Sequence, residues 1–368
     1  MIYLDHAATT PPDERVIEAM SACLRGAWQN PGAAYSAAGE ARRVLRRARQ
    51  TLADMLNAEA QEILFTSGGT EGNNQALALA QGGHAVIGAA EHASVLNAAK
   101  RIGCAVTLVP PDPSGVVSAE SVGRALRPDT RLICVQLANN ETGVVQPVRE
   151  IGALARAARV PFLCDAVQAF GRVPVDVKAM NIDLLTISAH KFYGPRGAGC
   201  LYARQGVPVA PLIDGGGQEF GLRSGTENVA AVEGMRVAAE LAAADMPAEA
   251  ERERALTGHF IKRLSALVPA ARILGADAPR LPGLVAVLMP GLSSEQAIAD
   301  LDLMGVQVSG GAACAARSRD VSHVYRAMGL SDADARCVLR ISVGRGTTAD
   351  DLTTAAEAVA EVYRRRAI

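Results

Sequence analysis

The sequence lacks several features by which common classes of protein are identified. Its 37 Lys and Arg residues are balanced by 38 Asp and Glu residues, which gives a formal net charge of -1. This balance disfavours a protein that binds nucleic acid or an anionic membrane surface through its overall charge. No uninterrupted apolar run of about 18 residues occurs, and the first residues, MIYLDHAATTPPDER, carry no basic-then-apolar leader. We therefore expect a soluble, cytoplasmic protein.

The sequence also has no Cys-x-x-Cys pair and few lysines. The seven cysteines are scattered, odd in number and never arranged as Cys-x-x-Cys, which predicts a reduced protein without a disulfide framework or a cysteine-rich zinc site. We assign no metal. Only four of the 37 basic residues are lysines, and none follows a glycine, so no Gly-Lys-Ser/Thr phosphate loop exists. This excludes a nucleoside triphosphatase of that type.

What the sequence does contain is a regular alternation of short apolar runs and helix-like stretches from about residue 62 onward. That rhythm predicts an α/β fold with a mostly parallel sheet covered by helices on both faces. Two alanine- and arginine-rich helical stretches follow, over residues 227–244 and 248–268. We predict a large domain of residues 12–250 and a smaller α+β domain of residues 1–11 and 251–368.

Residues that could carry chemistry lie where the apolar runs end, because ligands of parallel sheets gather at the carboxyl ends of the strands. Lys191 follows the run DLLTISA, where burial would lower the pKa of the amine and make it a nucleophile toward a carbonyl. Asp165 ends the run PFLCDA, and its carboxylate could hold a pyridinium N–H. The segment SGGTEGNN, residues 67–74, opens a helix and suits a phosphate. Taken singly, each has a plain alternative: a surface lysine, a capping aspartate and a simple turn.

Further polar side chains follow the neighbouring runs. His92 could stack on a flat ring or move protons near neutral pH, and Asn140 and Gln168 could bond an oxygen on that ring. Arg340 lies within the apolar run VLRISV, and its guanidinium suits a substrate carboxylate. Capping or structural roles remain open for each of them. Additional donors for an anion are Ser188, His190 and Thr226.

One cysteine differs from the others. Cys134, Cys164 and Cys200 lie inside apolar runs and are expected to be small core residues. Cys314 lies in the glycine- and alanine-rich stretch SGGAACAARSRD, whose two arginines would favour a thiolate. We predict that Cys314 is a reactive thiol, with a buried loop cysteine as the alternative.

Nine motifs follow one another from residue 3 to about residue 348. They are YLDHAATTP, FTSGGTEGNN, EHASV, NNETGVVQP, DAVQAFGRVPVDV, SAHKFYGPRGAGCLY, GGGQEFGLRSGTEN, SGGAACAARS and LRISVGRGTT. In this order they resemble the class V aminotransferase superfamily, and within it they are most similar to the cysteine desulfurases. The resemblance implies a fold-type I pyridoxal-phosphate enzyme that forms a homodimer with active sites at the subunit interface.

The resemblance also implies roles for residues at the cofactor. Lys191 would be the Schiff-base lysine, Asp165 the partner of the pyridinium nitrogen, and Gln168 a neighbour of the phenolic oxygen. His92 would stack on the ring and move protons, and Asn140 would lie near cofactor and substrate. The phosphate would be held by Gly69, Thr70, Ser188 and His190, together with Thr226 from the other subunit.

The activity implied is sulfur removal from L-cysteine. Cys314 would take the sulfur as a persulfide, Arg340 would hold the substrate carboxylate, and L-alanine would be released. The persulfide sulfur would then pass to a sulfur-acceptor protein of iron–sulfur cluster or other thio-cofactor biosynthesis. Alternatives are selenocysteine lyase or another class V reaction, and a non-catalytic homologue. A nicotinamide-dependent dehydrogenase is disfavoured because no G-x-G-x-x-G opens a helix after a predicted strand.

Three departures from the family pattern stand out. Residues 311–316 read GAACAA, whereas the family places Ser or Thr around the cysteine. Gly72 stands where the family commonly has serine, which removes a possible donor near the phosphate. The chain ends at Ile368 without the longer tail that contacts the cluster scaffold in related enzymes. The resemblance therefore leaves the acceptor unspecified.

Overall fold

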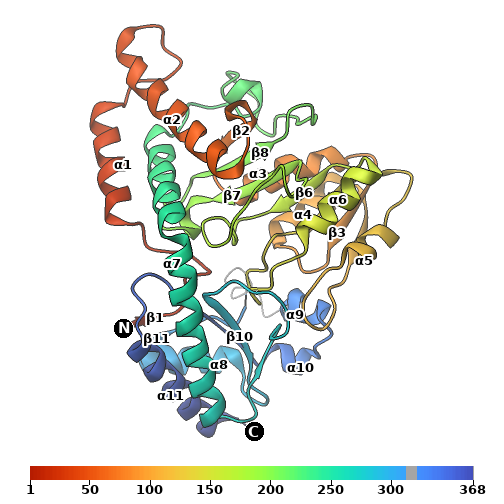
Figure 1. The fold of residues 1–368 in the computed structure, drawn as a ribbon, viewed down its shortest axis with the longest axis vertical. Helices are drawn as coiled ribbons and strands as arrows, with labels where there is room; N and C mark the ends of the chain where they lie inside the picture. Colours follow the sequence, from red (N-terminus) through yellow and green to blue (C-terminus); the bar gives the residue numbers. More distant parts are fainter. Residues whose placement is uncertain (312–320, 368) are drawn as a thin grey trace.

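The computed structural model describes residues 1–311 and 321–367. Its largest element is a seven-stranded sheet in the order β2-β8-β7-β6-β5-β3-β4 (Figure 1). The strands are β2 (Ile63–Thr66), β3 (His84–Gly88), β4 (Ala105–Val109), β5 (Thr130–Cys134), β6 (Phe162–Asp165), β7 (Leu184–Ser188) and β8 (Gly199–Ala203). Strands β3 to β7 run parallel, and β8 is antiparallel to both β2 and β7. The predicted α/β fold with a mostly parallel sheet is confirmed.

Helices cover both faces of this sheet because its strands are apolar on both sides. One face packs against helices α1 (Glu14–Gly26), α2 (Gly39–Leu56) and α6 (Val148–Ala158). The other face packs against α3 (Gly69–Leu77) and α4 (Ala93–Ile102). The short helix α5 (Ala119–Arg124) lies beside α6. Within β2, Ile63 and Phe65 belong to the first cluster and Leu64 to the second, as the alternation of side chains along a strand requires.

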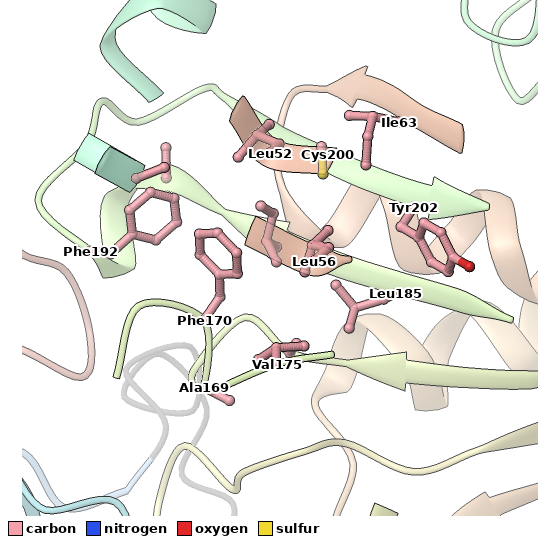
Figure 2. Close-up of a cluster of buried hydrophobic side chains, with 14 of the residues drawn as sticks. Leu52, Leu56, Ile63, Ala169, Phe170, Val175, Leu185, Phe192, Cys200 and Tyr202 are labelled. Carbon is pink, nitrogen blue, oxygen red and sulfur yellow. The ribbon is translucent and has the colours of Figure 1, made fainter. Parts of the chain in front are cut away.

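The core between α2 and the sheet contains a thiol. Figure 2 shows Cys200 in the same apolar cluster as Leu52, Ile63 and Tyr202. Burial raises the pKa of the Cys200 thiol to about 12. Cys134 and Cys164 are likewise fully buried in their strands. The predicted core role of these three cysteines is confirmed.

The carboxyl-terminal part forms a second, smaller core around two short sheets. One sheet has the order β12-β10-β9 with antiparallel pairs, and in the other β1 pairs with β11 in parallel. Their strands are β1 (Ile2–Tyr3), β9 (Arg272–Ile273), β10 (Leu284–Leu288), β11 (Val306–Gln307) and β12 (Val338–Ser342). Its helices are α8 (Ser294–Leu303), α9 (His323–Ala327), α10 (Asp332–Ala335) and α11 (Ala349–Arg366). The pairing of β1 with β11 fixes the start of the chain in this part of the molecule.

A single long helix, α7 (Val229–Leu267), joins the two parts (Figure 1). Met235 packs in the core of the large sheet, whereas Phe260 packs in the smaller core. The sequence predicted two helical stretches here, but the structure has one helix that continues through Pro247. Proline has no N–H, so Pro247 cannot donate to the carbonyl oxygen of Ala243. Both residues are exposed, and this carbonyl therefore lies on the solvent side of the helix.

The predicted domain boundary near residue 250 falls inside α7. Since the helix serves both cores, the division into two domains remains a proposal. None of the helices in the described part of the chain is long and apolar enough to span a membrane.

Candidate active site

A cavity of about 400 Å³ lies at the carboxyl ends of the parallel strands. Ten of the predicted site residues line it: Gly69, Thr70, His92, Asn140, Asp165, Gln168, Ser188, His190, Lys191 and Arg340. They come from sequence positions up to 271 residues apart, and the fold brings Arg340 of β12 to the strand ends of the large sheet. Two predicted residues are not among them: Thr226 lies elsewhere, and Cys314 lies outside the described residues.

Lys191 ends the short 3-10 helix η4 (Ala189–Lys191), which directly follows β7. Its Nζ donates to the carbonyl oxygens of Ala7 at 2.6 Å and Ala8 at 2.9 Å. Burial, with the charges of Arg340 and Arg172, lowers the pKa of the amine to about 8. About a tenth of this lysine is therefore neutral and nucleophilic at pH 7, far more than for an exposed lysine.

Asp165 is the last residue of β6 and is buried. Its Oδ2 accepts a hydrogen bond from Asn73 Nδ2 at 2.7 Å, and its Oδ1 accepts one from the backbone N–H of Val167 at 2.9 Å. These two donors satisfy a carboxylate that would otherwise be costly to bury. No role was predicted for Asn73 from the sequence, although it lies within the quoted motif SGGTEGNN.

His92 is the N-cap residue of α4. Its Nδ1 accepts a hydrogen bond from the backbone N–H of Ser94 at 3.1 Å and lies 2.9 Å from Ser94 Oγ. Burial lowers the pKa of the His92 imidazole; Asp165 opposes this shift, and Lys191 and His323 add to it.

The amino end of α3 forms a cradle for an anion. Gly68 has a φ of +151°, which side chains rarely adopt, and a Cβ on Gly69 would lie 2.4 Å from Val167 Cγ2. The backbone therefore approaches the cavity closely at Gly69 and Thr70, with Ser188 and His190 across from it. His190 Nδ1 lies 3.1 Å from Thr9 Oγ1, and burial lowers the pKa of the His190 imidazole to about 4.

The departure at Gly72 has a packing explanation. A Cβ at this position would lie 2.8 Å from Thr186 Cγ2 and 3.7 Å from Leu201 Cβ. Gly72 therefore packs against β7 and β8, and a serine there would point at the sheet. The expectation that glycine removes a donor from the phosphate is wrong for this chain.

Arg340 is 1% exposed and is already paired. Its Nη2 donates to Asp5 Oδ1 at 2.6 Å, and its Nη1 donates to the carbonyl oxygen of Asn140 at 2.8 Å. Its Nε has no hydrogen-bond partner among the residues the structure describes. Asp5 was not among the residues predicted from the sequence, and its signal is its place in the first motif, YLDHAATTP.

Thr226 is exposed and lines a separate cavity of about 290 Å³ with Leu24 and Trp28. Within one chain, the structure does not bring Thr226 to the cavity of Lys191.

The six cysteines that the structure describes all have a raised thiol pKa, with burial as the largest cause. None of these six is therefore suited to act as a thiolate. Within the same described residues, no group of three His, Cys, Asp or Glu side chains could hold a metal ion.

The donor set of the cavity fits pyridoxal phosphate. Lys191 offers an amine to the aldehyde, Asp165 offers a carboxylate to the pyridinium N–H, and the start of α3 offers backbone groups to the phosphate. Gln168 Nε2 donates to the carbonyl of Ala7 at 2.8 Å. Gln168 Oε1 is buried without a partner in the described part of the chain, as expected for a group that a ligand completes.

Comparisons with known proteins agree with this fit. The family model described as Aminotransferase class-V matches residues 2–354. Cysteine desulfurase IscS of Clostridium botulinum is 40% identical, and the match covers 99% of this chain and 95% of that protein. Cysteine desulfurase IscS of Anaeromyxobacter dehalogenans is 41% identical, with 99% and 93% covered.

Solved structures agree as well. The structure of a NifS-like protein from Rickettsia africae matches with a TM-score of 0.92 at 32% identity and covers 99% of both chains. Another, described as a NifS-like protein, has a TM-score of 0.91 at 32% identity. Because the family model and these full-length relatives span nearly all of the sequence, the protein belongs to the class V aminotransferase family of pyridoxal-phosphate enzymes.

Proposed function

We propose that this protein is a pyridoxal-phosphate-dependent cysteine desulfurase. The observation that carries the proposal is the buried Lys191 amine, with its pKa near 8, in the same cavity as the Asp165 carboxylate. Its full-length relatives are named cysteine desulfurases, which supports L-cysteine as the substrate.

Residues of this chain would hold the cofactor from three sides. Lys191 would bind the aldehyde carbon, Asp165 the pyridinium nitrogen and Gln168 the phenolic oxygen. His92 and Asn140 would flank the ring. The phosphate would lie against Gly69, Thr70, Ser188 and His190. When bound, pyridoxal phosphate supplies an electron sink that makes bond cleavage at the amino acid possible.

The substrate carboxylate would bind at Arg340. This guanidinium lines the cavity and retains a buried N–H, at Nε, that lacks a partner in the described residues. Asn140 lines the cavity beside it, and its backbone carbonyl accepts from Arg340. Together they would orient L-cysteine with its sulfur directed away from the carboxylate anchor.

The net reaction moves one sulfur atom. The C–S bond of L-cysteine breaks, an S–S bond forms at Cys314 Sγ, and L-alanine leaves with the proton from the Cys314 thiol. Atoms and electrons balance without an external oxidant. Cys314 is the candidate acceptor because the six cysteines in the described residues have raised pKa values.

We also propose a homodimer. Leu24 and Trp28 are 64% and 72% exposed and line the cavity that contains Thr226. Such large exposed apolar side chains are typical of an interface. A second copy over this surface would bring Thr226 to the partner's phosphate site. Trp28→Asp should produce a monomer in sedimentation velocity, and cofactor affinity should fall with it.

The persulfide implies a downstream acceptor. We propose a cytoplasmic protein with a nucleophilic thiol or an iron–sulfur scaffold as the recipient, in iron–sulfur cluster or other thio-cofactor biosynthesis.

A single-turnover reaction with L-cysteine tests the activity. Alanine and the mass of the Cys314-containing peptide are quantified, with Cys314→Ser as the inactive variant and Cys337→Ser as the matched control. One alanine per persulfide on Cys314, lost in Cys314→Ser alone, is expected. Full turnover in Cys314→Ser would overturn the proposal and favour selenocysteine lyase or another class V reaction.

A further inference from the structure

His92 has one ring nitrogen that is already committed to accepting hydrogen bonds. The backbone N–H of Ser94 donates to Nδ1 at 3.1 Å, as expected of the N-cap residue of α4. A backbone N–H can only donate, so Nδ1 must carry a lone pair. The proton of the neutral ring is then on Nε2.

A chain of hydrogen bonds behind His92 reinforces this arrangement. Asn73 Nδ2 donates to Asp165 Oδ2 at 2.7 Å and to Ser94 Oγ at 2.9 Å. Asn73 Oδ1 accepts from Thr186 Oγ1 at 2.8 Å. Because a carboxylate can only accept, the orientation of this amide is fixed. Ser94 Oγ accepts from Asn73, which leaves its own hydrogen to donate to His92 Nδ1 at 2.9 Å.

Most of the surroundings oppose a second proton on the ring. The amino end of α4 carries partial positive charge, and positive charge on Lys191 or His323 acts in the same direction. Among the described residues, the charge of Asp165 favours the imidazolium. Burial raises the pKa of the adjacent Glu91 carboxyl well above its ordinary value, which disfavours its negatively charged form.

We infer that Asn73 and Ser94 are positioning residues that hold His92 as the neutral Nε2–H tautomer, so that His92 donates a hydrogen bond and does not shuttle protons. Proton movement is left to Lys191, whose amine lies in the same cavity. The chain behind His92 carries no proton onward, because the amide of Asn73 ends it. Only the assignment to Lys191 rests on the proposed function; the tautomer does not.

Nitrogen-15 NMR of the holoenzyme with labelled histidine tests the tautomer directly. The protein has six histidines, so the His92 signals are identified by their absence in His92→Gln. We expect an unprotonated Nδ1 and a protonated Nε2 from pH 6 to pH 9. A doubly protonated ring, or a Nδ1–H tautomer, at any pH in this range would overturn the inference whatever the substrate is.

Variants separate positioning from folding. Ser94→Ala removes the hydroxyl that donates to His92 Nδ1. Asn73→Ala removes the amide that donates to this hydroxyl and orients it. In both we expect the pKa of His92 to rise, because the lone pair on Nδ1 loses a donor. Asn74→Ala is the matched control on the same helix, since Asn74 Nδ2 donates to the carbonyl of Thr70 and its Oδ1 accepts from Arg101, apart from the chain behind His92. An unchanged titration in both test variants would show that the chain does not set the tautomer.

A rate measurement separates the two roles of His92 itself. Gln keeps an N–H donor but cannot shuttle a proton, whereas Phe keeps only the ring face. If His92 is a donor, His92→Gln should turn over L-cysteine about tenfold faster than His92→Phe, as one retained hydrogen bond implies. Equal losses in both variants would contradict the donor role.

Discussion

Lys191 shows how one side chain derives its chemistry from its surroundings. The amine is buried among acceptor carbonyls, and Arg340 and Arg172 add positive charge nearby. Burial and the two guanidinium charges disfavour the ammonium form, and they outweigh the carbonyl acceptors, which favour it. The pKa falls from the ordinary 10.5 to about 8, so the neutral amine is available at a pH about 2.5 lower than in an exposed lysine.

This shift predicts the pH dependence of cofactor loading. The rate at which the apoprotein binds pyridoxal phosphate should rise about tenfold per pH unit below pH 8 and level off above it, because only the neutral amine reacts. Stopped-flow absorbance between pH 6 and pH 10.5 measures this rate. A rate that continues to climb until pH 10 would show an ordinary lysine.

Asp5 is the residue that neutralises Arg340 before substrate arrives. Asp5→Asn would leave a buried guanidinium without its counter-charge, which should destabilise the protein by about 3 kcal/mol. L-alanine supplies a carboxylate to the same guanidinium. It should therefore raise the melting temperature of the Asp5→Asn holoenzyme more than that of the parent.

The control for Asp5→Asn is Asp129→Asn. Asp129 and Arg127 form an exposed ion pair with side chains about half accessible, so its loss should change stability by less than about 1 kcal/mol. If L-alanine stabilises Asp5→Asn no more than the parent, Arg340 is not the carboxylate anchor.

At the scale of elements, the junction of β2 and α3 depends on small residues. The chain approaches the segment that follows β6 so closely at Gly69 that a Cβ would clash with Val167. Gly69→Ala should push the start of α3 away from the phosphate site. We expect at least a tenfold weaker affinity for pyridoxal phosphate and a loss of about 1–3 kcal/mol in stability. Fluorescence titration and urea unfolding measure the two effects.

Two further variants test whether the clash is the cause. Gly258→Ala, within α7 and with no atom near the added carbon, should instead stabilise the protein by about 1 kcal/mol. The double variant Gly69→Ala, Val167→Ala should regain most of the lost affinity, because it removes the opposing side chain. Affinity that stays low in the double variant would rule out this contact as the cause.

For the whole molecule, His6 links pH to stability. It is buried, it packs edge-on against Tyr3 at 4.8 Å, and burial lowers its pKa from 6.5 to about 4. Between these two values the unfolded chain binds a proton that the folded chain does not. Stability should therefore fall as pH drops from 6.5 to 4, by about 3 kcal/mol from this residue at 1.36 kcal/mol per pH unit.

Urea unfolding across this pH range measures the effect. In His6→Asn, the part of the pH dependence of the unfolding free energy that is due to His6 should disappear. His259→Asn, the same change at an exposed histidine, is the control for the substitution itself. Equal slopes in the parent and His6→Asn would show that His6 is protonated in the folded protein.

The sequence by itself determined the strand rhythm and the residues at strand ends. Apolar runs of four to five residues correspond to the observed strands β2, β6 and β7. Alternation of apolar and polar residues is a local property, and parallel strands expose their carboxyl ends at one edge. The order of residues along the chain was therefore enough to predict that Lys191 and Asp165 share one site.

Only the tertiary structure decided which groups those residues meet. Asp5 reaches Arg340 across 335 positions, and the carbonyl of Ala7 reaches Lys191 across 184. The continuity of α7 through Pro247 and the packing of Gly72 on Thr186 were also decided there. These contacts depend on how β1 pairs with β11 and how helices settle on the sheet. Such distant pairings cannot be predicted from local periodicity. They depend on the packing of surfaces that meet only when the chain folds.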